Sequence, residues 1–161
     1  MIKAFNNILA YSLAELGRPE GSPGRLAIAV AGDDVRSKQI VMDVVNETGF
    51  DPVDAGSLVE SWRQEPATPA YCCDYNAKTT RKGLAAAVKG EAPKKLQHLI
   101  DLYRQRGSNM THADIVTVNR SLNRSNDLGI FEPLQQAYIL TGREGFRNGA
   151  WPLSRIVVGS R

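Results

Sequence analysis

Two short segments of the chain carry side chains suited to holding a small ligand. Asn6 and Asn7 follow an apolar run at the start of the chain, and Gly56, Ser57 and Leu58 lie at the end of the third β-like run. In open α/β sheets, ligands bind at the carboxyl ends of the strands. Amide and hydroxyl groups beside small residues suit a flat ring with a polar edge. These residues therefore predict a ring-binding site, and helix capping and turn formation are their alternative roles.

A glycine and two aspartates, Gly32, Asp33 and Asp34, lie between an apolar run and a helical pattern, where α/β proteins often bind phosphate. The two carboxylates complement the positive end of the helix dipole themselves and would repel a phosphate group. We therefore predict that one of these aspartates caps the helix. No GxGxxG or GxxxxGKS/T pattern occurs, so the usual loop for the pyrophosphate of a dinucleotide is missing.

The histidines, the cysteines and Ser57 form no pattern typical of a catalytic or metal site. His98 and His112 are the only histidines, and neither has the spacing of a metal-binding pair, so structural or solvent-facing roles are expected. Ser57 lacks the GxSxG context of a nucleophile. Cys72 and Cys73 are adjacent, and sequence neighbours rarely bridge, so we expect two buried thiols in a reducing compartment. We predict no catalytic residue and no metal ligand.

Composition and charge restrict the class of protein. The chain has 161 residues, 42% of them hydrophobic, which is enough for one domain with a core. No apolar stretch approaches the roughly 18 residues of a membrane span, and no secretory signal is visible, so a cytoplasmic protein without membrane contact is expected. Residues 94–161 contain 10 Lys and Arg against 5 Asp and Glu. Without an aromatic-interleaved basic patch, this excess favours a solvated face or a subunit contact over nucleic-acid binding.

Strand and helix signals alternate in the first part of the chain, which indicates an α/β fold. The middle apolar run shows no alternation, so we expect a strand covered on both faces. Asn6 or Asn7 is expected to cap the helix that follows the first strand. The predicted strands are residues 2–5, 26–31 and 52–56, and the predicted helices are residues 8–16 and 35–48.

The second of these helices has four apolar residues at helical spacing. Ile40, Val41, Val44 and Val45 are expected to form one stripe that faces the core.

The rest of the chain is predicted to be mainly helical. Capping signals occur at residues 57–60 and 111–114, and Gly107 ends a helical pattern. We therefore divide the chain into an α/β part, residues 1–65, and a helical C-terminal region, residues 66–161. The expected helices lie near Trp62 and at residues 76–88, 93–106, 112–123 and 133–140, and residues 155–159 form an edge strand or an arm onto a partner.

Three motifs of the chain, in order, resemble successive motifs of NADP oxidoreductases of the deazaflavin-dependent type. They are IKAFNNILAYSLAELGRP, LAIAVAGDD and GFDPVDAGSLVESWRQEPATPAYC, and they cover residues 2–73. The chain is similar over the same region to the cytosolic reductase domain of six-transmembrane ferric reductases. The resemblance implies the distal part of a Rossmann-like sheet, with about three strands and two helices.

The resemblance also implies cofactors and binding residues. Members of the family move a hydride between the nicotinamide of NADP and a flavin or deazaflavin, which depends mainly on positioning the two rings. By position, two segments of this chain match those that line the ring pocket. The implied cofactor-binding residues are Asn6, Asn7, Ile8, Gly56, Ser57 and Leu58.

The family fold begins with a glycine-rich turn and several βα units that this chain lacks. Residues 2–5 would then be the last strand of the parallel part of a sheet whose earlier strands are missing. We expect a truncated or fragmentary chain, or a second chain that supplies the pairing edge. The leading hypothesis is the distal portion of an NADP-dependent oxidoreductase, unable to bind the dinucleotide alone. The alternative is a non-catalytic module that forms homo-oligomers through exposed edges and apolar patches.

Overall fold

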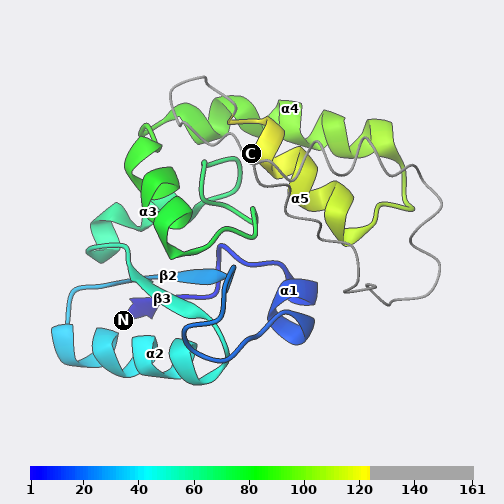
Figure 1. Ribbon diagram of the computed structural model, residues 1–161. Coiled ribbons are helices and arrows are strands. Elements are labelled where there is room, and N and C mark those ends of the chain that lie inside the picture. Colours follow the sequence, from blue (N-terminus) through cyan, green and yellow to red (C-terminus); the bar gives the residue numbers. More distant parts are fainter. Residues whose placement is uncertain (124–161) are drawn as a thin grey trace, which may run out of the picture. The chain divides into compact units, whose positions relative to one another are not determined.

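The first half of the protein forms a mixed three-stranded sheet with helices on both faces (Figure 1). The structure is a computed structural model, and it describes residues 1–123. The strands β1 (Ile2–Lys3), β2 (Ala27–Gly32) and β3 (Asp51–Asp54) lie in the order β1-β2-β3. β2 and β3 are parallel, whereas β1 is antiparallel to β2, with Ile2 opposite Gly32. The predicted α/β fold is confirmed.

The central strand β2 is buried along its whole length, as its unbroken apolar run predicted. Ile28 and Val30 pack with Val45 and Phe50 on the face covered by α2 (Val35–Glu47). The alternate residues are all alanine, and they face α3 (Ala77–Ala86). Figure 1 shows the two helices on opposite sides of the sheet.

The alanine face of the sheet allows a close approach of α3. Gly83 of α3 lies against the segment before it, and a Cβ atom there would be 3.1 Å from the Pro69 carbonyl oxygen and 3.2 Å from Ala70 Cβ. At these distances a side chain is accommodated only if its neighbours move by a few tenths of an ångström. The lack of a side chain at Gly83 therefore allows α3 to lie close to the segment that carries Pro69 and Ala70.

The first strand and first helix are both shorter than predicted. β1 ends at Lys3, because the backbone turns and Phe5 adopts a left-handed φ of 61°. α1 (Ala10–Glu15) begins after Leu9 without a side-chain cap, so the prediction that Asn6 or Asn7 caps it is wrong. The side chain of Asn7 is used elsewhere, as described below.

The second helix begins where predicted, but only part of its predicted apolar stripe faces the core. Asp34 caps α2 and accepts a hydrogen bond from the Ser37 amide at 2.7 Å. Val41 packs with the buried Val45 against the sheet, whereas Ile40 and Val44 are 56% and 44% exposed. The predicted four-residue stripe is therefore wrong for these two residues, because the sheet contacts a face of the helix centred about 100° away from them.

The remaining described elements are helical, as predicted. Asn76 caps α3 through the Thr79 amide, and Thr111 and Asp114 form the predicted capping box. The capping box expected at residues 57–60 is absent, because Ser57 makes no side-chain cap bond and a 3-10 helix follows it. The elements are η1 (Leu58–Gln64), α3, α4 (Glu91–Arg106) and α5 (His112–Ser121).

A small apolar cluster joins α4 and α5. Leu99 and Val118 are buried with Ala67, and Leu102 and Tyr103 pack against them. Among residues 1–123, no helix has the length and apolar character needed to cross a membrane. The predicted helix at residues 133–140 and the predicted strand or arm at residues 155–159 lie outside the described residues.

Candidate functional site

Asn7, a predicted ligand-binding residue, is a structural partner of β2. Its side chain is 4% exposed, its Nδ2 donates to the Ala27 carbonyl at 3.4 Å, and its Oδ1 accepts from the Ala29 amide at 3.0 Å. Its backbone carbonyl accepts a hydrogen bond from the Cys72 amide at 3.0 Å. The Asn7 amide thus continues the hydrogen bonding of β2 where β1 has already ended. Asn6 is exposed, and Ile8 packs on the α2 side of the core.

The second predicted segment forms a tight turn after β3. Gly56 adopts a left-handed φ of 84°, which favours glycine. Its carbonyl accepts from the Gly32 amide at 3.0 Å, and its amide donates to Asp54 Oδ1 at 2.8 Å. The Leu58 amide donates to Asp33 Oδ1 at 3.0 Å, and Ser57 between them is half-buried.

The structure does not bring the two predicted segments together. Asn7 contacts β2 at Ala27 and Ala29, whereas Gly56 contacts it at Gly32, which is about 10 Å beyond Ala29 along the strand. The physical reason is that β1 runs antiparallel to β2 and β3. The carboxyl end of β1 therefore lies at one end of the strands, and the carboxyl end of β3 lies at the other. The binding of a cofactor by either segment stays a prediction.

Carboxylates already occupy the amides at the carboxyl ends of β2 and β3. Lys38 Nζ bridges Asp54 Oδ1 at 2.8 Å and the Gly56 carbonyl at 3.4 Å. Burial raises the pKa of Asp54, but the bonds from Lys38 and the Gly56 amide outweigh it and leave the pKa lowered. The hydrogen bond from Ser37 lowers the pKa of Asp34. The carboxyl ends of β2 and β3 are therefore a poor site for the phosphates of a dinucleotide.

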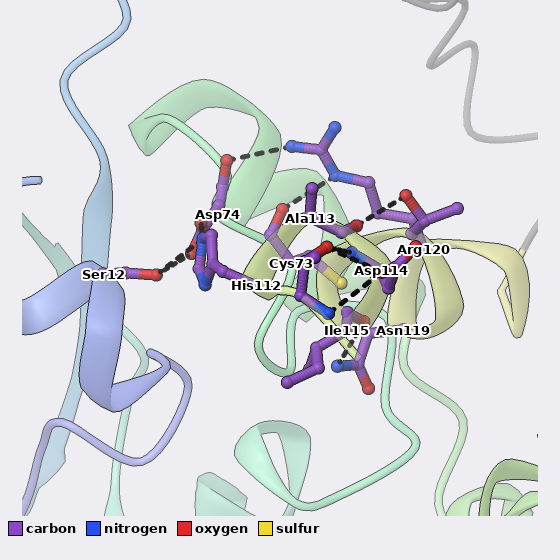
Figure 2. A network of polar contacts seen from close by, with 11 residues as sticks. Ser12, Cys73, Asp74, His112, Ala113, Asp114, Ile115, Asn119 and Arg120 are labelled. Atoms are coloured by element: carbon purple, nitrogen blue, oxygen red, sulfur yellow. Dashed lines mark hydrogen bonds and ion pairs between the residues drawn. The ribbon is translucent and has the colours of Figure 1, made fainter. Parts of the chain in front are cut away.

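A second cluster of chemically competent side chains joins three distant segments. Ser12 Oγ donates to Asp74 Oδ1 at 2.7 Å, and His112 Nε2 lies 2.7 Å from Asp74 Oδ2. Ser12 belongs to α1, Asp74 to the loop before α3, and His112 is the first residue of α5 (Figure 2). The Tyr11 ring lies 4.7 Å from the His112 ring, centroid to centroid.

This cluster has the residue types of a hydrolytic triad without its geometry. In such a triad the histidine bonds the serine through one ring nitrogen and the carboxylate through the other. Here Nε2 faces both Asp74 and Ser12, the latter at 3.4 Å, and Nδ1 is buried without a partner among the described residues. Ser12 is completely buried, so no substrate reaches it. The cluster links α1 to α5, which is the structural role expected for His112.

Arg120 holds the loop that carries Asp74. Its Nε donates to the Cys73 carbonyl at 2.8 Å and its Nη2 to the Asp74 carbonyl at 3.1 Å, while its guanidinium lies 4.9 Å from the Tyr75 ring centroid. Cys72 and Asp74 adopt left-handed φ angles of 51° and 49°. Such angles in residues other than glycine persist only where the surroundings hold them.

The cysteines are two free, buried thiols, as predicted. Burial raises the pKa of Cys72 to about 11 and that of Cys73 to about 12, with Arg120 opposing the rise at Cys73. Both side chains are therefore protonated and unreactive at neutral pH. Among residues 1–123, no three His, Cys, Asp or Glu side chains lie close enough to hold a metal ion.

No sequence pattern predicts the cluster of Ser12, Asp74 and His112. The pairs are separated by 62 and 38 residues, and none of the three stands in a recognisable motif. The pairing of Asn7 with β2 was not predictable either, because an asparagine just before a helical pattern is normally interpreted as its N-cap.

Comparison with known proteins finds similarity to a protein of Escherichia coli. No protein-family profile and no solved structure matches the chain. The chain is 51% identical over 105 residues to the protein YjhV of Escherichia coli strain K12, a match that covers 65% of this chain and 77% of the relative. Identity at this level over most of the relative establishes common descent. The chain therefore belongs to the same protein family as Escherichia coli YjhV.

Proposed function

We propose that this chain is the distal portion of a cytoplasmic NADP-dependent oxidoreductase that transfers a hydride between NADP and a flavin or deazaflavin. The observation that carries the proposal is the position of β1. Among the described residues, β1 pairs on one side only, with β2, and so forms an edge of the sheet. Ile2, Ala4 and Phe5 nevertheless pack into the core on the α2 side. Within β1 itself, Ile2 is partly buried against the core, and one edge of the strand has no pairing partner among the described residues, which fits a sheet that continues beyond it.

The phosphates of NADP do not fit the described residues. The ends of β2 and β3 present Asp33, Asp34 and Asp54, and their carboxylates already hold the amides that a phosphate would need. We therefore propose that the phosphate-binding loop comes from a separate polypeptide or from an upstream segment, placed against the free edge of β1. When bound, the nicotinamide supplies the hydride chemistry. The part left to this chain is to position a ring.

Two segments are proposed to contact that ring separately. Asn6 is exposed beside the end of β1, and Gly56, Ser57 and Leu58 form the turn after β3. The two segments lie at opposite ends of the sheet, so they cannot contact the same ring within one chain. We propose that Asn6 contacts the ring bound by this chain, and that the turn after β3 is available to a ring held by a neighbouring molecule.

Calorimetric titration with NADPH tests the proposal. The chain alone is expected to show no micromolar binding, because it lacks a phosphate loop. Mixed with the glycine-rich N-terminal half of a deazaflavin-dependent NADP oxidoreductase, it is expected to bind NADPH and to support reduction of a deazaflavin. Failure of the mixture to bind NADPH, with both parts folded, would refute the proposal.

A matched pair of substitutions localises the ring contact. Asn6→Ala is expected to weaken NADPH binding by the mixture several-fold, whereas Asn109→Ala, an equally exposed asparagine after α4, is expected to leave it unchanged. Equal effects of the two substitutions would remove Asn6 from the site.

A second candidate function, an oligomerising module, is favoured by a different observation. Ile40 and Val44 are exposed on α2, although sequence spacing assigned them to the core. Exposed apolar side chains that recur on one helix face are typical of interaction surfaces. Sedimentation of the full chain tests this function, and a monomer at high concentration would count against it.

A further inference from the structure

The outer face of α2 carries an apolar pair between groups of opposite charge. Ile40 and Val44 lie one helical turn apart and are 56% and 44% exposed. Arg36 lies one turn before the pair and Glu47 nearly one turn after it, and both are exposed. At 100° per residue, the four side chains fall within about 80° of the helix circumference. They form one narrow stripe, and we call it the α2 stripe.

The charges of the α2 stripe are unpaired within the described part of the chain. Arg36 and Glu47 take part in no ion pair there, whereas Lys38, on the opposite side of the helix, pairs with Asp54. The sheet contacts α2 through Val41, Met42 and Val45, so the stripe is not needed for the core. The stripe is therefore free to meet another surface.

We infer that the α2 stripe binds the α2 stripe of a second copy of the chain, with the two helices antiparallel about a twofold axis. In this arrangement Ile40 of each copy faces Val44 of the other. Arg36 of each copy then lies opposite the residue that follows Glu47 in the other copy, which places the opposite charges close together. The stripe is therefore complementary to itself. A parallel arrangement would set Arg36 against Arg36 and Glu47 against Glu47. Antiparallel packing also aligns the helix dipoles favourably.

We infer that the partner is a second copy because the charges of the stripe are complementary to those of a second stripe related to it by a twofold axis. A single helix face is smaller than the roughly 800 Å² per partner of a standard interface, so the dimer is expected to be weak. The inference rests on the oligomerising function proposed above and does not depend on NADP binding.

Sedimentation equilibrium of the full chain, from about 10 µM to 1 mM, measures this association. The wild-type chain is expected to form a dimer in the upper part of this range. Ile40→Glu is expected to weaken dimerisation at least tenfold, since it places two carboxylates in the centre of the contact. Gln39→Glu adds the same charge at an exposed position about 100° away from Ile40 and is expected to have little effect.

Charge exchange tests the direction of the helices. Arg36→Glu and Glu47→Arg are each expected to weaken the dimer, because each places like charges opposite one another at two symmetric positions. The double variant R36E/E47R restores opposite charges and is expected to recover the wild-type association. All these positions are exposed, so the fold is expected to survive, and circular dichroism checks it. A double variant weaker than both single variants would overturn the antiparallel arrangement.

Cross-linking gives an independent measure of register. With a copper–phenanthroline oxidant, a mixture of Ile40→Cys and Val44→Cys chains is expected to form mixed disulfides faster than either variant links to itself. The wild-type chain controls for Cys72 and Cys73, whose burial is expected to protect them.

The outcomes separate this interface from the function on which it rests. A wild-type chain that stays monomeric to 1 mM would overturn both the α2 interface and the oligomerising function. A dimer that is unaffected by Ile40→Glu would leave the oligomerising function standing and overturn the α2 interface alone.

Discussion

Asn7 shows how one side chain can take the place of a strand residue. β1 pairs with only two residues of β2, and the Asn7 amide bonds β2 at Ala27 and Ala29. Asn7→Ala would leave a buried amide and a buried carbonyl without these partners. We expect a loss of about 1–3 kcal/mol in the free energy of unfolding, measured by urea denaturation.

The neighbouring asparagine is the control for this prediction. Asn6 is exposed, and Asn6→Ala is expected to change the free energy of unfolding by less than about 0.5 kcal/mol. A loss at Asn7 no greater than that at Asn6 would show that the amide pairing adds nothing to stability.

Asp54 is expected to make the stability of the fold depend on pH in the acid range. Burial raises the pKa of Asp54, but Lys38 and the Gly56 amide lower it further, to below the ordinary value of 3.8. A group with a lowered folded pKa stabilises the protein above its unfolded pKa, and this contribution disappears as the pH falls through the folded pKa. Asp54→Asn is therefore expected to destabilise the protein at neutral pH and to flatten the fall in stability below pH 3.8.

Denaturation midpoints between pH 2 and pH 7 measure this effect. Asp43→Asn is the control, because Asp43 is exposed on α2 and, among residues 1–123, its side chain bonds Gln39 alone. Parallel pH curves for the wild-type chain and Asp54→Asn would contradict the assignment.

At the scale of elements, α3 contacts the segment before it tightly at Gly83. Gly83→Ala adds a methyl group 3.1 Å from the Pro69 carbonyl oxygen, where backbone must move to accept it. Alanine favours a helix by up to about 1 kcal/mol over glycine, but overpacking typically costs about 1–3 kcal/mol. We expect a net loss of stability, measured by thermal unfolding. Lys82→Ala, at an exposed position of the same helix, is expected to be close to neutral.

The elements were predicted best where their signals are local. The Asp34 cap and the Thr111 capping box depend on residues three apart, and both are present. The face of α2 that packs on the sheet was not predictable from the sequence. Ile40 with Val44 and Val41 with Val45 form two equally apolar pairs, and the position of the helix on the sheet determines which pair is buried. The two predicted ligand segments were expected to meet, but strand direction, which the sequence does not encode locally, separates them.

At the scale of the whole described molecule, Arg120 joins α5 to the loop that follows Cys72. Arg120→Ala removes its bonds to the Cys73 and Asp74 carbonyls and its contact with the Tyr75 ring. The left-handed residues of the loop are then held less firmly, so we expect the buried thiols to react several-fold faster with a thiol reagent such as DTNB. Arg104→Ala, at an exposed position of α4, is the control. Equal labelling rates would show that Arg120 does not hold the loop.

The pairing of Asn7 with β2 has a consequence for the fate of the chain in the cell. The segment AIAVAG of β2 is apolar and uncharged, the kind of sequence that stacks into amyloid fibrils when its edge is accessible. Asn7 and β1 together cover one edge of this segment, and the other edge is covered by β3, whose proline and aspartates discourage further stacking. Clipping of the first seven residues by a protease would therefore convert a well-folded protein into a seed for fibrils, detectable by thioflavin fluorescence.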